Sequence, residues 1–249
     1  MAEKEIKIIN GTEIAFYPAS HQRRVNGKQI PTVSTISGMI DKSNQLLIWS
    51  ERLARTFLKN FLGKELTEEV IEQAVMQYKI IKEERGESGT DVHDLCERFA
   101  KAVMNNTEKP IVNETTPQPV INGYMAFLKW YNENDVEFIE SERDVYSKEY
   151  NYVGTFDVLM KVNGIITLGD FKTGSNVYPE YFVQLSGYKQ AYDEENTGIK
   201  IEHLMVLHFN KDTGDFDIKT KHEKEIDVKH FNALLEIKRF LADLTKSIK

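Results

Sequence analysis

The chain has 249 residues, of which 41% are hydrophobic and 10% aromatic, so it can bury a sizeable core and is not a disordered protein. Its formal net charge of −7 excludes a protein that wraps nucleic acid through overall basicity, so any such contact would use local basic patches or a metal ion. Its one cysteine, Cys96, excludes an internal disulfide and a cysteine-ligated zinc or iron–sulfur site.

The first residues, MAEKEIKII, are charged and lack the apolar centre of a signal peptide. No apolar run in the chain approaches the roughly 20 residues of a membrane span. We therefore expect a soluble intracellular protein that makes no membrane contact.

The N-terminal segment carries a hairpin signal. Residues 3–17 alternate between polar and apolar side chains and break at Asn10-Gly11, which predicts a small β-hairpin. The basic stretch HQRRVNGKQI, residues 21–30, predicts a loop that is either simply solvated or contacts phosphate.

From Thr32 to about Asn134, apolar residues recur at helical spacing. Ser34 or Thr35 is expected to cap the first helix, and Gly63 to stop the second. Five helices are predicted, over residues 34–39, 45–62, 67–81, 90–104 and 120–133.

After Asp135 the period of the apolar residues changes to that of strands. Strands are predicted over residues 136–148, 152–162, 165–172, 201–209 and 214–220, with helices over 178–194 and 228–248. This order predicts an α/β core over residues 135–249. Residues 1–134 form an N-terminal hairpin and helical region before it.

Two acids interrupt the apolar strands on either side of Asn163-Gly164, which is a strong signal for a two-residue hairpin turn. A regular register places Asp157 directly opposite Asp170, and Lys172 points to the same face as Asp170. Two carboxylates facing each other repel, so we expect a divalent cation between them. The alternative is a surface hairpin whose acids face water and form a salt bridge with Lys172.

Four sequence motifs resemble those of the PD-(D/E)XK nuclease superfamily, in its RecB-like branch. They are GTFD at 154–157, DFKTG at 170–174, QLSGY at 184–188 and, upstream, GTDVHDLCE at 89–97. Residues 30–49 are also similar to the helical entry of phage and mitochondrial-genome-maintenance-type exonucleases of this branch. The resemblance implies an α/β fold with a restriction-endonuclease-like core, in which a central mixed sheet is flanked by helices, behind an N-terminal helical region.

The resemblance also implies roles for single residues. Its metal ligands fall on His93, Asp157, Asp170 and the backbone carbonyl of Phe171. Its catalytic lysine falls on Lys172. Its helix motif beside the active site falls on Gln184 and Tyr188, which are four residues apart and so share a helical face.

The expected cofactor is Mg²⁺, which prefers oxygen ligands, or Mn²⁺, which also suits imidazole. No iron–sulfur cluster is expected. Glu97, one turn after His93, either accepts the ring N–H of that histidine or is simply an exposed acid. Glu142 is a candidate ligand for a second metal ion.

Three further residues are candidates for contact with DNA. Arg52 and Arg55 are three residues apart in the second predicted helix, where they either line a path for a strand backbone or are solvated. Thr173 follows the catalytic lysine that the resemblance implies.

The resemblance implies a metal-dependent deoxyribonuclease, and we expect an exonuclease that prefers single-stranded DNA ends, in DNA replication, recombination or repair. The alternatives are a structure-selective endonuclease and a non-catalytic nucleic-acid-binding module of the same fold. The expected partners are DNA and a recombinase or single-strand-binding protein, in the cytoplasm of a bacterium or phage-infected host cell. Cleavage polarity, DNA against RNA, one metal ion or two, and oligomeric state all stay open.

Overall fold

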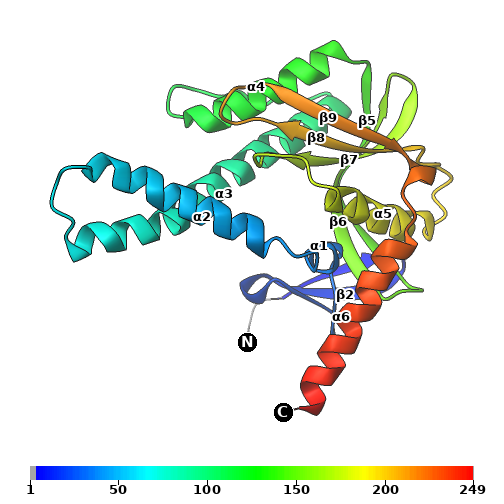
Figure 1. The fold of residues 1–249 in the computed structure, drawn as a ribbon. Helices are drawn as coiled ribbons and strands as arrows, with labels where there is room; N and C mark the ends of the chain where they lie inside the picture. Colours follow the sequence, from blue (N-terminus) through cyan, green and yellow to red (C-terminus); the bar gives the residue numbers. More distant parts are fainter. Residues whose placement is uncertain (1–3, 249) are drawn as a thin grey trace.

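The computed structural model describes residues 4–248, and its centre is a five-stranded mixed sheet (Figure 1). The strand order is β5-β6-β7-β8-β9, with β7 and β8 parallel and the other neighbours antiparallel. The strands are β5 Val136–Ser147, β6 Tyr152–Val162, β7 Ile165–Lys172, β8 His203–Phe209 and β9 Phe216–His222. All five lie where the sequence predicts strands.

Helices cover both faces of this sheet, which confirms the predicted fold class. On one face, α3 (Glu68–Asn105) and α4 (Gln118–Glu133) pack in one hydrophobic cluster with β6, β7 and β8. On the other face, α1 (Val33–Ser37), α5 (Glu180–Asp193) and α6 (Lys229–Ser247) pack in a second cluster with the same strands. The short 3₁₀ helices are Pro18–Ser20, Lys59–Phe61 and Glu223–Glu225.

A separate four-stranded sheet precedes the helices. Its strands are β1 Glu5–Ile9, β2 Thr12–Tyr17, β3 Gln22–Val25 and β4 Lys28–Ile30. The hairpin at Asn10-Gly11 is confirmed, although residue 3, where its predicted range begins, lies outside the described residues. The prediction of a loop over residues 21–30 is wrong, because this segment forms the β3–β4 hairpin. Its turn is Asn26-Gly27, with φ of 50° and 76°, the turn pair that hairpins favour.

Two helix predictions need correction. Thr32 caps α1 by accepting the backbone N–H of Thr35 at 3.2 Å, so neither Ser34 nor Thr35 is the cap. The predicted third and fourth helices are one helix, α3, of 38 residues. The two glycines between the predicted helices, Gly86 and Gly89, do not interrupt α3, since a glycine inside a helix costs only about 1 kcal/mol. Packing against α2 (Ser43–Leu58) stabilises the first half of α3.

The α2–α3 pair extends away from the sheet as a helical hairpin (Figure 1). Within the described residues, no helix combines the length and the apolar character needed to cross a membrane.

Candidate active site

The two acids lie where strands β6 and β7 separate. The turn residues Asn163-Gly164 have φ of 49° and 88°, both positive as a type I′ turn requires. From this turn to the pair Val158–Gly169, the strands keep the predicted register. The pairing stops there, so the expectation that Asp157 lies directly opposite Asp170 in the ladder is wrong.

Asp157 is placed by an irregularity in β6. Its Oδ2 accepts the backbone N–H of Phe171 at 2.6 Å, so the carboxylate bridges the opening between the two strands. Phe156 packs with α5, whereas Val158 packs with α3 and α4. Residues two apart on a regular strand share a face, so β6 changes face at Asp157.

Asp170 and Lys172 lie together on the other side of this opening. Asp170 is 1% exposed, and the Lys172 ammonium contacts its Oδ2. The ammonium also lies 5.0 Å from the ring centroid of Tyr181 in α5, which favours a cation. The alternative of a surface hairpin is therefore excluded in one respect, because Asp170 does not face water. The ion pair with Lys172 that this alternative predicts is present.

The pKa values of both acids and of the lysine in the site are raised. Burial, together with repulsion from Asp157, raises the pKa of Asp170 to about 6, although Lys172 opposes the shift. Burial also raises the pKa of Asp157. Burial disfavours the Lys172 ammonium, but Asp170 and Asp157 outweigh it and raise the pKa of Lys172. Each carboxylate therefore gains from a positive charge placed near it.

His93 reaches the same opening from α3. Its Nδ1 lies 3.8 Å from Oδ2 of Asp157, and its ring packs edge to face against Phe171. Burial, with smaller effects from the cations Lys172 and Lys211, lowers the pKa of His93 to about 4. The imidazole is therefore neutral near pH 7, which is the form that binds metal ions.

Helix α5 contacts Asp170 through Gln184. Gln184 Nε2 lies 3.5 Å from Oδ1 of Asp170 and donates to the Tyr188 hydroxyl at 2.9 Å, so the two helix residues do share a face. Tyr188 lies against Gly154 of β6, where an added Cβ would be 2.5 Å from the tyrosine ring. The glycine of the GTFD motif is thus required by close packing.

Glu142 lies beside Asp157 on β5. The neighbouring pairs, Ser141–Val158 and Arg143–Phe156, place it across from Asp157. Its φ of 51° is left-handed, a strained backbone for glutamate that is typical of functional sites. Desolvation and repulsion from Asp157 raise the pKa of Glu142 to about 7, although its side chain is exposed, so water screens part of this effect.

The remaining predicted residues are less closely tied to the acids. Glu97 pairs with Lys101, and within residues 4–248 no hydrogen bond joins it to His93, so of its two alternatives a role towards the histidine stays a prediction. Arg52 and Arg55 are exposed on α2. In the described part of the chain, neither arginine makes an ion pair or a hydrogen bond through its side chain.

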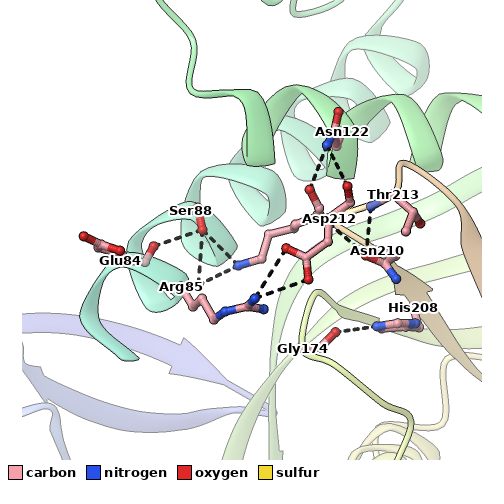
Figure 2. Close-up of polar contacts among 10 residues, drawn as sticks. Glu84, Arg85, Ser88, Asn122, Gly174, His208, Asn210, Asp212 and Thr213 are labelled. Atoms are coloured by element: carbon pink, nitrogen blue, oxygen red, sulfur yellow. Dashed lines mark hydrogen bonds and ion pairs between the residues drawn. The ribbon is translucent and has the colours of Figure 1, made fainter. Parts of the chain in front are cut away.

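A polar cluster that the sequence did not reveal joins α3 to the β8–β9 turn (Figure 2). Lys211 is 4% exposed, and its ammonium donates to the Arg85 carbonyl at 2.6 Å and to Ser88 Oγ at 3.0 Å. Asp212 pairs with the Arg85 guanidinium at 3.3 Å. Asn122 of α4 donates to the Lys211 carbonyl at 2.9 Å. The cluster fixes α3 one to two turns before His93.

The segment after Lys172 is held against the same helix. Thr173 Oγ1 lies 2.8 Å from the position of a Cβ on Gly89, so the glycine allows α3 to approach this segment. The ring of His208, in β8, shares a hydrogen bond of 2.5 Å between its Nε2 and the Gly174 carbonyl (Figure 2). The only sequence signal for this arrangement was the pair of glycines at 89 and 174, and nothing marked Lys211 or His208.

The donor set fits a divalent cation that prefers oxygen ligands. Oδ2 of Asp170 is buried and, among the described residues, accepts no hydrogen bond of regular geometry. Asp157 adds a second carboxylate, and His93 a neutral imidazole 3.8 Å from it. Within residues 4–248, however, no group of three or more His, Cys, Asp or Glu side chains is arranged to hold a metal ion.

Comparisons with known proteins give structural likenesses. No protein-family model matches the chain, and no curated protein matches its sequence. The structure is similar to that of LHK-Exo in complex with dAMP, with a TM-score of 0.32 and 13% identity, covering 63% of this chain and 86% of that one. A second structure, of the alkaline exonuclease LHK-Exo from Laribacter hongkongensis, has a TM-score of 0.30, with the same identity and coverage.

The structure of SSO0001 is also similar, with a TM-score of 0.31 and 17% identity, covering 78% of this chain and 86% of that chain. With TM-scores of 0.30 to 0.32, these likenesses do not decide which reaction this chain performs.

Proposed function

We propose that this chain is a PD-(D/E)XK deoxyribonuclease that hydrolyses phosphodiester bonds with the help of Mg²⁺ or Mn²⁺. The observation that carries the proposal is the juxtaposition of a buried carboxyl group, Asp170, and a partly buried one, Asp157, with the Lys172 ammonium and the neutral imidazole of His93. These groups come from β6, β7 and α3 and meet where β6 and β7 separate.

Asp157, Asp170, His93 and the carbonyl of Phe171 would hold the metal ion. When bound there, it would lower the pKa of a water molecule and draw charge from the phosphate. The ammonium of Lys172 would donate to a phosphate oxygen and stabilise the charge that develops on it. Gln184, which also donates to Tyr188, would orient the Asp170 carboxylate. The exposed carboxylate of Glu142 would be a ligand for a second metal ion.

We further propose that the enzyme is an exonuclease that prefers single-stranded ends. The α2–α3 hairpin, which extends from the sheet and carries the exposed residues Arg52 and Arg55, would guide a strand towards the acids. A role in DNA replication, recombination or repair, together with a recombinase or single-strand-binding partner, follows from the sequence resemblance alone.

The decisive experiment incubates linear and circular DNA, single- and double-stranded, with Mg²⁺, Mn²⁺ or a chelator. We expect degradation of linear single strands with either metal ion and none with chelator. Cutting of circular single strands would replace the exonuclease with an endonuclease. No cleavage under any condition would refute the nuclease proposal.

The chain offers a matched control for the acidic site. Asp217-Ile218-Lys219 has the same Asp-x-Lys spacing as the site, and its Asp217 and Lys219 form an ion pair of 2.7 Å on the exposed strand β9. Asp170→Asn should abolish cleavage, whereas Asp217→Asn should leave it unchanged. Equal activity of these two variants would place the chemistry elsewhere.

A further inference from the structure

A polar cavity lies away from the acids, between the small N-terminal sheet and the C-terminal helix. Its volume is about 510 Å³. Its walls are the β3–β4 hairpin, the segment that leads into α1, and the last turns of α6. The basic stretch HQRRVNGKQI therefore does not stand alone, because the fold brings it to the basic face of a helix more than 200 residues later in the chain.

The charge of this cavity opposes that of the whole protein. Four Lys or Arg side chains line it, together with one acid, Asp243, in the described part of the chain. The four cations are Arg23, Lys238, Arg239 and Lys246. The chain as a whole has 39 acidic and 32 basic residues, so a local excess of cations at one concave surface is not a consequence of composition.

The fold holds these cations in place and leaves most of their donors free. The Lys238 ammonium donates to the Thr35 carbonyl at 2.9 Å, and the Arg239 guanidinium donates to the Tyr150 carbonyl. A carbonyl fixes the side chain but does not neutralise its charge. Since an ammonium has three donors and a guanidinium five, further donors remain for an anion.

The other two cations are only partly neutralised. Lys246 pairs with Asp243 at 2.9 Å, and both side chains are more than three-quarters exposed, so water weakens this pair. The guanidinium of Arg23 lies 3.6 Å from Asp144 and 4.9 Å from the ring centroid of Phe16.

Helix α1 separates this cavity from the candidate active site. Thr32 and Thr35, at the start of α1, line the cavity. Val33, between them, packs against Gly154, where an added Cβ would be 2.8 Å from its methyl group. Asp157 follows three residues later on β6. Helix α1 contacts both α6 and the active-site strand β6 (Figure 1). One short helix thus connects the lining of the cavity to the strand that carries Asp157.

We propose that this cavity binds the sugar–phosphate backbone of a nucleic-acid strand, as a second contact remote from the acids. Several cations with polar Gln, Thr and Asn side chains between them suit phosphates, and the lining residues include no Phe, Tyr or Trp ring and a single imidazole, His21. The inference rests on the proposed function only in taking nucleic acid as the ligand.

The test measures binding without cleavage. The affinity of a fluorescently labelled single-stranded oligonucleotide is determined by anisotropy in chelator, at several salt concentrations. The double variant Lys238→Gln with Lys246→Gln is compared with the parent protein. Because each lost phosphate contact lowers the slope of log affinity against log salt by about 1, we expect a decrease of about 2 in its magnitude.

The control is Lys219→Gln with Lys221→Gln, two exposed lysines on β9 that pair with acids at 2.7 and 3.0 Å. It removes the same charge and should leave the slope unchanged. The single variant Lys246→Gln, at an exposed position, should lower the magnitude of the slope by about 1. It serves as a check if the double variant misfolds. Thermal melting shows whether each variant is folded.

Equal slopes for the parent and the double variant would overturn the inference, as would a parent that binds no oligonucleotide. The proposed function fails separately. If the double variant shows the expected change of slope but the parent cleaves no DNA with Mg²⁺ or Mn²⁺, the binding site is supported and the nuclease proposal is refuted.

Discussion

At the residue scale, the site sets like charges against each other and places one cation among them. Asp170 is buried beside Lys172, and Asp157 takes a backbone N–H that the strand pairing leaves free. Neither carboxyl group is stabilised in its charged form by protein alone, since the pKa of each is raised. Perturbed pKa values of this kind cluster at functional sites.

The first prediction concerns Lys172. Lys172→Ala should retain metal binding and DNA binding, but its cleavage rate should fall by a factor of about 10²–10³. This is the loss typical when one stabilising donor is removed from a preorganised site. The measurement is cleavage of an end-labelled oligonucleotide, with melting temperatures recorded with and without Mn²⁺. Lys219→Ala, on the exposed Asp-x-Lys of β9, is the control. A Lys172→Ala variant that cuts like the parent would remove this lysine from the catalytic set.

The second prediction concerns the pH dependence of stability in chelator. The pKa of Asp170 is about 6 in the folded protein, against 3.8 as its ordinary value. A raised pKa means that the folded state binds more protons between these values, so the contribution of Asp170 to stability falls as the pH rises from about 4 to about 6.

The free energy of unfolding of the parent should therefore decrease across this range relative to that of Asp170→Asn, by about 1–3 kcal/mol. Denaturant unfolding at a series of pH values measures this difference. A difference that does not vary with pH would show that Asp170 is not held in an unfavourable environment.

At the scale of elements, close approaches of backbone position the site. Gly154 of β6 lies against Tyr188 of α5, and Gly89 of α3 lies against Thr173. Lys211 then fastens the middle of α3 to the β8–β9 turn. The pairing of β6 with β7 ends at Val158–Gly169, and beyond it the Asp157 carboxylate accepts the backbone N–H of Phe171.

The third prediction compares two glycines. Gly154→Ala should destabilise the protein by about 1–3 kcal/mol, because the new methyl group would meet the Tyr188 ring at 2.5 Å. Gly86→Ala, inside α3 where nothing lies within 4 Å, should stabilise it by up to about 1 kcal/mol. Urea unfolding of both variants is the measurement, and the prediction fails if their effects have the same sign.

The fourth prediction concerns Lys211. Lys211→Met fills a similar volume but leaves the Arg85 carbonyl and Ser88 without their buried donor, so we expect a loss of about 1–3 kcal/mol in stability. It also removes a cation that lowers the pKa of His93, so that pKa should rise, which NMR titration of the ring can measure. Lys79→Met, exposed on the same helix, should change neither quantity.

At the scale of the whole molecule, the helices before residue 135 and the sheet after it share one core. Val92 and Phe99 of α3 and Phe127 of α4 are buried in the cluster that covers β6, β7 and β8. The division into regions 1–134 and 135–249 stays a prediction, and the packing suggests that it marks a change of sequence pattern and not of folding unit.

The fifth prediction follows from this shared core. A fragment of residues 135–249 should not fold alone, because it would expose the face of the sheet that α3 and α4 cover. Circular dichroism and thermal melting of the fragment would test this, with the full chain as the control. A cooperative transition in the fragment would establish residues 135–249 as an independent domain.

The sequence by itself determined the five strands of the central sheet, their order along the chain and the β6–β7 hairpin, because alternation of apolar residues and an Asn-Gly turn are local signals. It also singled out Asp170 and Lys172, whose spacing of two on a strand puts them on one face. The resemblance to a nuclease family added Gln184 and Tyr188, whose spacing of four on a helix lets them share a face.

Only the tertiary structure decided the rest. The end of the pairing at Asp157, the left-handed backbone of Glu142 and the burial of Lys211 depend on what packs against each residue. So does the meeting of residues 21–30 with α6, which are more than 200 positions apart. The physical reason is that local sequence sets the conformation of each element, whereas the register, burial and charge of a site arise from contacts between elements that no local pattern encodes.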